Sequence, residues 1–296
     1  MAPTLNRTNQ WLLLLAVVLL LLLLWQPAGD SPQSSRLTDL SGDEIEQITI
    51  QGPHDPPFTL TRGTERGWLY ADSLVEADPQ KVDALLDLAT TPVYDRFELA
   101  RSSAREQYIA AADKAWVRFN ELTIRFGQSH PVGQRRYVSL AVEGAPSSVP
   151  ATIALIDDLY YHHLLSPAEQ WIRPSPLPPA AALNRISLPS VTLTRDDQRW
   201  FASPPILTTE QITRIVEDWQ GFRATRISLR DNGAQRDPLP AVTLGWQSVD
   251  NQTESITLRL VQLNLESQLL RDDQPVIYHL ESDHAARLLQ LPDGLH

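Results

Sequence analysis

Phe58-Thr59-Leu60-Thr61-Arg62 and Val191-Thr192-Leu193-Thr194-Arg195 are the two stretches that decide the fold predicted from this sequence. Both alternate apolar and polar residues with a period of two, which is typical of a β-strand with one buried face. Each is followed by a turn that ends at a tryptophan, Trp68 in the first case and Trp200 in the second. The chain therefore resembles a tandem repeat, in which one order of elements occurs twice.

An amphipathic helix is predicted after each of these stretches. Asp78 and Pro79 are a typical N-cap and first helical residue, and Thr208 opens the matching helix in the second half. The apolar residues recur at the spacing i, i+3, i+4 and i+7, which favours one buried face: Val82, Leu85, Leu86 and Ala89 in the first helix, and Ile212, Ile215, Val216 and Trp219 in the second.

Further alternating strands complete each half. They are predicted at 117–119, 122–126 and 152–156 in the first half and at 242–244, 256–260 and 275–280 in the second. We therefore expect an α+β fold, a tandem pair of similar modules behind one N-terminal transmembrane helix. Each module is expected to be a mostly antiparallel sheet with a packed helix.

The segment from Trp11 to Trp25 predicts a membrane contact. It holds fifteen uncharged residues, ten of them leucine, between two tryptophans. Its helical length of about 22 Å is short for a hydrocarbon core of roughly 30 Å, and cleavage after Ala28 is the alternative to an uncleaved anchor. We expect a single-pass protein of the bacterial inner membrane, with a cytoplasmic N-terminus and most of the chain in the periplasm.

Breaks in composition divide the chain. The stretch from Arg173 to Ala182 is rich in proline, which disfavours helix and central strand. The expected organisation is a cytoplasmic tail at 1–10, a transmembrane signal-anchor at 11–25, a tether at 26–44, a first α+β module at 45–172, a proline-rich linker at 173–184 and a second α+β module at 185–296.

Composition excludes several classes of function. The net charge of −11 disfavours a nucleic-acid partner, which requires a basic surface. The chain has no cysteine, which excludes disulfides, thiolate nucleophiles and cysteine-held metal clusters. It also lacks the GxSxG, HExxH, P-loop and GxGxxG motifs. We therefore expect no catalytic residues and no cofactor.

The segment from Asp157 to His163 is the strongest candidate for a metal site. Its carboxylates and imidazoles, at Asp157, Asp158, His162 and His163, are ligand types that suit zinc. Adjacent histidines on a helix point about 100° apart, however, and a third ligand would have to come from elsewhere. The alternative is that Asp158 caps a short helix and the histidines are solvated. We expect no metal site here.

Arg135, Arg136 and Tyr137 are candidate partner-binding residues. Arg135 and Arg136 are adjacent arginines that could hold a carboxylate or phosphate of a partner, and a charged, solvated strand edge is the alternative. Trp68 and Trp200 could form a carbohydrate platform, but burial of both in the two cores is favoured.

The first half resembles the domain-of-unknown-function 4340 family. The residues that carry the resemblance are Ile48 and Ile50, Phe58, Leu60 and Arg62, Gly67-Trp68, Ala77-Asp78-Pro79, Leu122, Ile124 and Phe126-Gly127, and Gln134-Arg135-Arg136-Tyr137-Val138. It covers residues 45 to about 165 well and the second half weakly, because the second half lacks the Phe-Gly turn and the Gln-Arg-Arg-Tyr-Val segment. The resemblance implies a single-anchor bacterial envelope protein linked to ABC-type transporter components, and it implies no catalytic residues.

We therefore expect a membrane-anchored periplasmic accessory or scaffold subunit of an envelope assembly, most plausibly an ABC-type transporter. Its expected partners are the lipid bilayer, through Trp11 to Trp25, and membrane proteins such as ABC transporter subunits, with no nucleic acid. One alternative is a membrane-tethered periplasmic hydrolase or metal-dependent enzyme centred near Asp157 to His163. Another is a glycan- or substrate-binding module.

Overall fold

The structure is a computed structural model of the chain. It describes residues 35–53, 55–63, 67–70, 73, 75–99, 108–109, 115–142, 144, 151–179, 181–230, 241–248, 252–263 and 266–289. The statements that follow concern these residues.

The first module is built around an eight-stranded antiparallel sheet. Its strands lie in the order β3-β2-β1-β5-β6-β7-β8-β4, and one α-helix, α2 (Pro79–Thr90), belongs to it. The strand bounds are β1 (Gln47–Gln51), β2 (Phe58–Arg62), β3 (Trp68–Tyr70), β4 (Asp95–Leu99), β5 (Trp116–Phe119), β6 (Leu122–Ser129), β7 (Arg135–Val142) and β8 (Ala151–Asp157), and a single 3-10 turn, η1 (Gly42–Glu44), precedes them.

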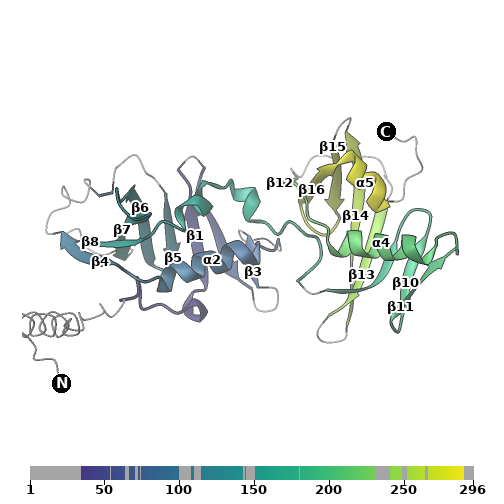
Figure 1. Ribbon diagram of the computed structural model, residues 1–296, viewed down its shortest axis with the longest axis horizontal. Coiled ribbons are helices and arrows are strands. Elements are labelled where there is room, and N and C mark those ends of the chain that lie inside the picture. Colours follow the sequence, from purple (N-terminus) through teal and green to yellow (C-terminus); the bar gives the residue numbers. More distant parts are fainter. Residues whose placement is uncertain are drawn as a thin grey trace, which may run out of the picture.

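The second module repeats this plan. Its sheet has the order β11-β10-β9-β13-β14-β15-β16-β12, so every strand has a counterpart at the same place in the first sheet. The bounds are β9 (Ala182–Ser187), β10 (Thr192–Asp196), β11 (Arg199–Ser203), α4 (Thr209–Gln220), β12 (Arg226–Leu229), β13 (Ala241–Gln247), β14 (Thr253–Leu263), β15 (Glu266–Arg271), β16 (Val276–Glu281) and α5 (Ser282–Leu289). Figure 1 shows the two modules side by side along the longest axis.

The two long helices begin where their sequences indicate. The side chain of Asp78 accepts a hydrogen bond from the backbone N–H of Gln80, and Pro79 fills the first helical position. Thr208 and Gln211 form a reciprocal capping box at the start of α4. In both helices the apolar face is the buried one, as the helical spacing of its residues requires.

Equivalent residues of β2 and β10 lie in the two cores. Leu60 and Leu193 are both completely buried. In the strand register Arg62 lies opposite Trp68, and Arg195 lies opposite Trp200. Trp68 is buried, but Trp200 is only partly buried and packs against the rim of the core, so the prediction of two equally buried tryptophans was wrong for Trp200.

The predicted α+β fold class was wrong. The chain is mostly β, because each module is an eight-stranded antiparallel sheet and the α-helices have only 12, 12 and 8 residues. The strands β4, β12 and β15 account for much of the difference. The sequence did not reveal them, since they are short and carry polar residues among their apolar ones, as in the sequence DRFEL of β4. The short helix that Asp158 was considered to cap is the 3-10 turn η2 (Tyr161–Leu165), and its N-cap is Tyr160.

The predicted location is also corrected. Within the part of the chain described above, no helix combines the length and the apolar character needed to cross a membrane. A single-pass protein of the inner membrane, with its N-terminus in the cytoplasm and its bulk in the periplasm, is therefore not supported. The tail 1–10 and the expected transmembrane segment 11–25 lie outside the described residues.

The end of the expected tether is packed on the first module. Leu37 is completely buried, and its backbone N–H donates to the carbonyl of Thr91. The side chain of Thr38 donates to the carbonyl of Ala89. These contacts tie the chain to the C-terminal end of α2 before β1 begins.

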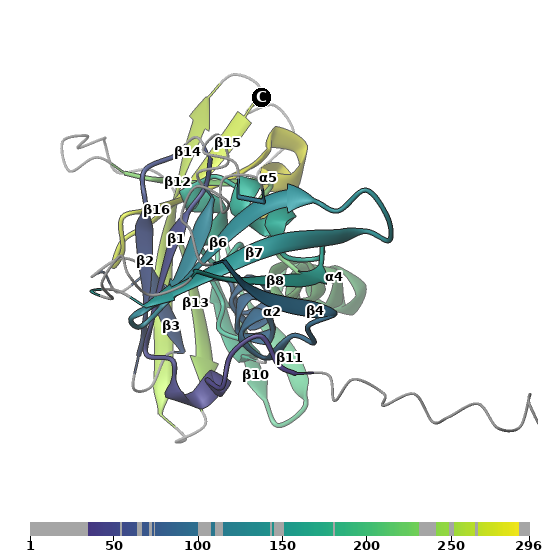
Figure 2. The same ribbon diagram turned by 90° about the vertical axis from the view of Figure 1, so that its left-hand side faces the viewer.

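The first sheet is strongly twisted. Figure 2, in which the first module faces the viewer, shows β7 and β8 running at a large angle to β1, β2 and β3. The chain leaves β8 through η2 and a second 3-10 turn, η3 (Ala168–Trp171), and η3 contacts β12 of the second module. The start of β7 and the end of β8 pair with one another and form one end of this strand pair.

Candidate functional site

The predicted arginines and aspartates meet at this end of the first sheet. Antiparallel pairing places Arg135 opposite Asp157 and Arg136 opposite Ile156. The chain turns after β8, where the backbone N–H of Asp158 donates to the carbonyl of Gln134. Two pairs of charged residues that lie more than twenty positions apart in sequence are thus neighbours in space.

Arg136 is held by four groups of the protein itself. Its Nε and Nη2 atoms lie 2.7 and 3.0 Å from the two carboxylate oxygens of Asp158. Its Nη1 donates to the carbonyl of Gly127 at 2.6 Å, and its Nη2 also donates to Ser129 Oγ at 2.9 Å. The guanidinium lies 3.7 Å from the centre of the Tyr161 ring. Arg136 therefore acts as a structural cation, and its bidentate face is not available to a partner.

Arg135 is arranged differently. Its guanidinium lies over the ring of Tyr94, 3.6 Å from the ring centre. The hydroxyl of Tyr94 donates to Asp157 Oδ2 at 3.1 Å, and this hydrogen bond is the main reason why the pKa of Tyr94 is raised. A cation, an aromatic ring and a carboxylate are therefore fixed next to one another at the surface.

The strand that carries these residues lies inside the sheet. β7 is hydrogen-bonded to β6 on one side and to β8 on the other, so the alternative of a solvated strand edge was wrong. Tyr137 is partly buried, and its ring makes edge contacts with Tyr108 at 5.0 Å and with His130 at 5.6 Å. Tyr137 contributes to an aromatic cluster on the sheet.

The histidines lie apart from these carboxylate contacts, on η2. The rings of His162 and His163 are 3.9 Å apart, and the pKa of His163 is lowered, first by burial and then by the charges of His162 and Lys81. Asp158 is occupied by Arg136, and Asp157 accepts from Tyr94. Among the residues that the structure describes, no three metal-ligating side chains lie close enough to share an ion.

A metal analysis tests this arrangement. We expect protein purified without a histidine tag to contain zinc, manganese and nickel well below one ion per chain, because at least three ligands are needed for tight binding. The measurement is elemental analysis of the native chain and of the double variant His162→Ala, His163→Ala. One tightly bound ion per chain that is lost in the double variant would contradict this expectation.

Exposed apolar side chains lie in three segments next to the start of β7, and the sequence analysis did not identify them. Val132 in the β6–β7 turn is 70% exposed, Leu159 after β8 is 62% exposed and Tyr94 is 46% exposed. We call Tyr94, Val132, Arg135 and Leu159 the β7–β8 patch. The signal in the sequence was an apolar residue in each of two turns where polar residues are usual.

Comparisons with protein-family models, with curated proteins and with solved structures gave no match for this chain. The resemblance to the domain-of-unknown-function 4340 family therefore stays a prediction.

Proposed function

We propose that the chain is an accessory or scaffold subunit that binds another protein through the β7–β8 patch. One observation carries the proposal: where β7 begins beside the end of β8, three separate segments each present an exposed apolar side chain, and one of these, Tyr94, is stacked with Arg135. Exposed apolar groups with polar neighbours are typical of protein interaction sites.

The composition of the patch suits a protein interface. Tyrosine and arginine are enriched at such interfaces and supply many of the residues that dominate binding energy. Arg135 and Tyr94 are already stacked, so little conformational freedom is lost when a partner covers them. The Arg136–Asp158 pair lies beside the patch and fixes the end of β8 against the start of β7.

The partner implied by the resemblance is a subunit of an ABC-type transporter, and such subunits are the first to test. Binding of this kind needs no catalytic residue in the first module. The alternative of a metal-dependent enzyme near Asp157 to His163 has less support, because the carboxylates are held by Arg136 and Tyr94. A glycan platform built on Trp68 has less support because Trp68 is buried.

Two substitutions in the patch test the proposal. We expect Leu159→Asp and Arg135→Glu each to raise the Kd for the partner at least about tenfold, since each removes about 1.4 kcal/mol or more of the binding energy contributed by the patch. The partner is identified by co-purification of ABC transporter subunits from detergent extract, and the Kd is then measured with purified proteins.

Val142 provides a matched control for these variants. It is 52% exposed at the opposite end of β7, so Val142→Asp places the same charge on the same strand outside the patch. We expect this variant to bind as the unmodified chain does. If the patch variants and the control lost the same affinity for the partner, or if none of them lost affinity, the patch would be refuted as the binding site.

A further inference from the structure

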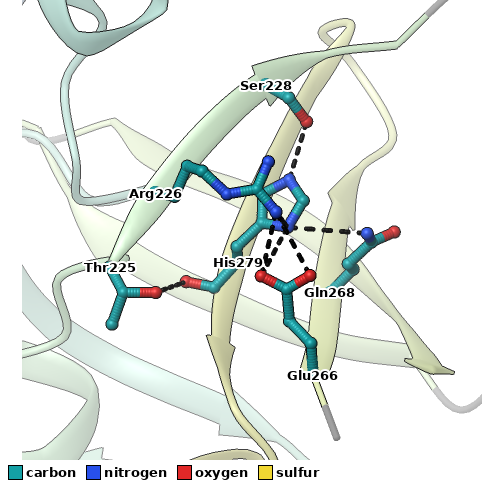
Figure 3. Close-up of polar contacts among 6 residues, drawn as sticks. All are labelled: Thr225, Arg226, Ser228, Glu266, Gln268 and His279. Atoms are coloured by element: carbon teal, nitrogen blue, oxygen red, sulfur yellow. Dashed lines mark hydrogen bonds and ion pairs between the residues drawn. The ribbon is translucent and has the colours of Figure 1, made fainter. Parts of the chain in front are cut away.

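A second polar cluster lies in the other module, on β12, β15 and β16. Figure 3 shows Arg226 and Ser228 from β12, Glu266 and Gln268 from β15, and His279 from β16 pointing toward one another. His279 is only 3% exposed, and it pairs across the sheet with Arg226 on one side and Gln268 on the other. The strand register alone therefore brings these side chains to one face.

The imidazole of His279 lies between a hydroxyl group and a carboxylate. Ser228 Oγ lies 2.7 Å from Nε2 of the imidazole, and Glu266 Oε1 lies 3.1 Å from Nδ1. Both distances fall within the range of about 2.6 to 3.2 Å that links a nucleophile to its base and the base to an orienting group. Arg226 Nη2 binds both carboxylate oxygens of Glu266, at 3.0 and 3.2 Å.

We infer that Ser228 is a nucleophile for acyl transfer, with His279 as its general base and Glu266 as the group that orients His279. The substrate class is a simple carboxylic ester. This activity is independent of the β7–β8 patch, which lies in the other module, and it goes beyond the proposed binding function. It would also revise the expectation that the chain has no catalytic residues.

The charge state of Glu266 favours the required tautomer of His279. The pKa of Glu266 is lowered, mainly by its hydrogen bond from Arg226, so this carboxylate is ionised at neutral pH. An ionised carboxylate accepts a proton from Nδ1–H, which leaves the lone pair on Nε2 for the hydroxyl of Ser228. In the competing tautomer Nδ1 accepts from Arg226 Nη2, 2.9 Å away, and from Gln268 Nε2, 3.5 Å away, and Nε2–H donates to Ser228. That tautomer places the Nδ1 lone pair against the negative charge of Glu266.

The position of Ser228 allows a substrate to approach. β12 is the last strand of its sheet and is also contacted by η3 of the first module, while Ser228 is partly exposed and the neighbouring Leu229 is 37% exposed to solvent. The backbone N–H of Arg230 donates to the carbonyl of Pro275, which lies on the β16 side of β12. Because N–H groups alternate in direction along a strand, the N–H of Leu229 is directed to the outer edge of β12. This N–H is the candidate donor to a developing oxyanion.

The reaction proceeds in two balanced steps. In the first, Ser228 Oγ attacks the carbonyl carbon, its proton passes to His279 Nε2, and the alcohol leaves with that proton to give an acyl-serine. In the second, water attacks the acyl carbon, its proton passes to His279, and Ser228 leaves with the proton to release the carboxylic acid.

A fluorophosphonate probe tests this proposal on the full chain. Ser228 would displace fluoride from phosphorus, and its proton would pass to His279. We expect one label per chain on Ser228, detected by peptide mass spectrometry, and loss of that label in Ser228→Ala. Labelling is expected to slow about 10²-fold or more in His279→Gln, which removes the base. Ser187→Ala on β9 is the serine control and should label at the rate of the unmodified chain.

Two further measurements keep the test decisive if His279→Gln fails to fold. Glu266 is at the surface, with a side chain 41% exposed, so Glu266→Gln should fold, and we expect it to slow labelling at least about tenfold. Nitrogen-15 NMR of the imidazole should show the proton on Nδ1. A proton on Nε2, labelling that persists in Ser228→Ala, or equal labelling rates in Glu266→Gln and the unmodified chain would overturn the proposal.

Discussion

Replacement of Trp219 by alanine is expected to lower the free energy of unfolding by about 3 to 5 kcal/mol. Trp219 lies on α4 and is completely buried. Its ring packs 5.9 Å from that of Phe222, and its Nε1 donates to the carbonyl of Leu288 on α5 at 3.1 Å. Alanine would leave a large cavity between the two helices and would leave that buried carbonyl without its donor.

Trp200 offers the control for this variant. It has the same side chain in the same module, but it lies on β11 at the edge of the sheet and is only partly buried. Trp200→Ala should therefore cost clearly less than Trp219→Ala in urea denaturation followed by circular dichroism. If the two variants lost the same stability, the placement of α4 and α5 over the second core would be in doubt.

Trp219 also shows what the sequence could predict. It was assigned to an apolar helical face from its spacing to Ile212, Ile215 and Val216, and all four residues are buried on α4. Leu60 and Leu193 were assigned to strands from alternation, and both are fully buried. Local periodicity can be recognised in a sequence because the residues that share one face of a helix or strand are only a few positions apart.

The fold class was missed in part because one edge strand of each sheet pairs only with a strand distant in sequence. β4 and β12 have little alternation of their own, and each is completed by pairing with β8 or β16 far along the chain. β7 was open to interpretation as a solvated edge because nothing in its own residues shows that β8 covers its second side. Trp200 was expected in the core because it occupies the position in the repeat that matches Trp68. That position does not show how far the core of the second module extends over β11.

The candidate sites were predictable only in part, for the same reason. Arg135 and Arg136 were found as an adjacent pair, but the sequence could not show that one is bound by Asp158 and the other stacked on Tyr94. Ser228, Glu266 and His279 come from three strands, and their spacing in sequence matches no motif. Only the register of β12, β15 and β16 places them together.

Arg136→Met is expected to lower the free energy of unfolding by about 3 kcal/mol. The substitution keeps an unbranched apolar stem but removes the cation that satisfies Asp158, Gly127 and Ser129. Breaking a buried ion pair by removal of one partner costs about 3 to 5 kcal/mol. The lower end applies here, because the side chains of Arg136 and Asp158 are 11% and 21% exposed and water can partly solvate the remaining carboxylate.

A double-mutant cycle separates this ion pair from the rest of the network. Asp158→Asn retains the shape of the side chain but removes its charge, and we expect a coupling energy with Arg136→Met of about 1 to 3 kcal/mol from urea denaturation. Arg135→Met is the control, since Arg135 stacks on an exposed tyrosine, and surface substitutions usually change stability by about 0.5 kcal/mol or less. Substitutions of the two arginines should therefore have different effects. Arg136→Met destabilises the module, whereas Arg135 variants impair partner binding in a folded protein. A stability loss at Arg135 as large as that at Arg136 would mean that the β7–β8 patch is part of the structural network, and the binding losses at Arg135 would then report misfolding.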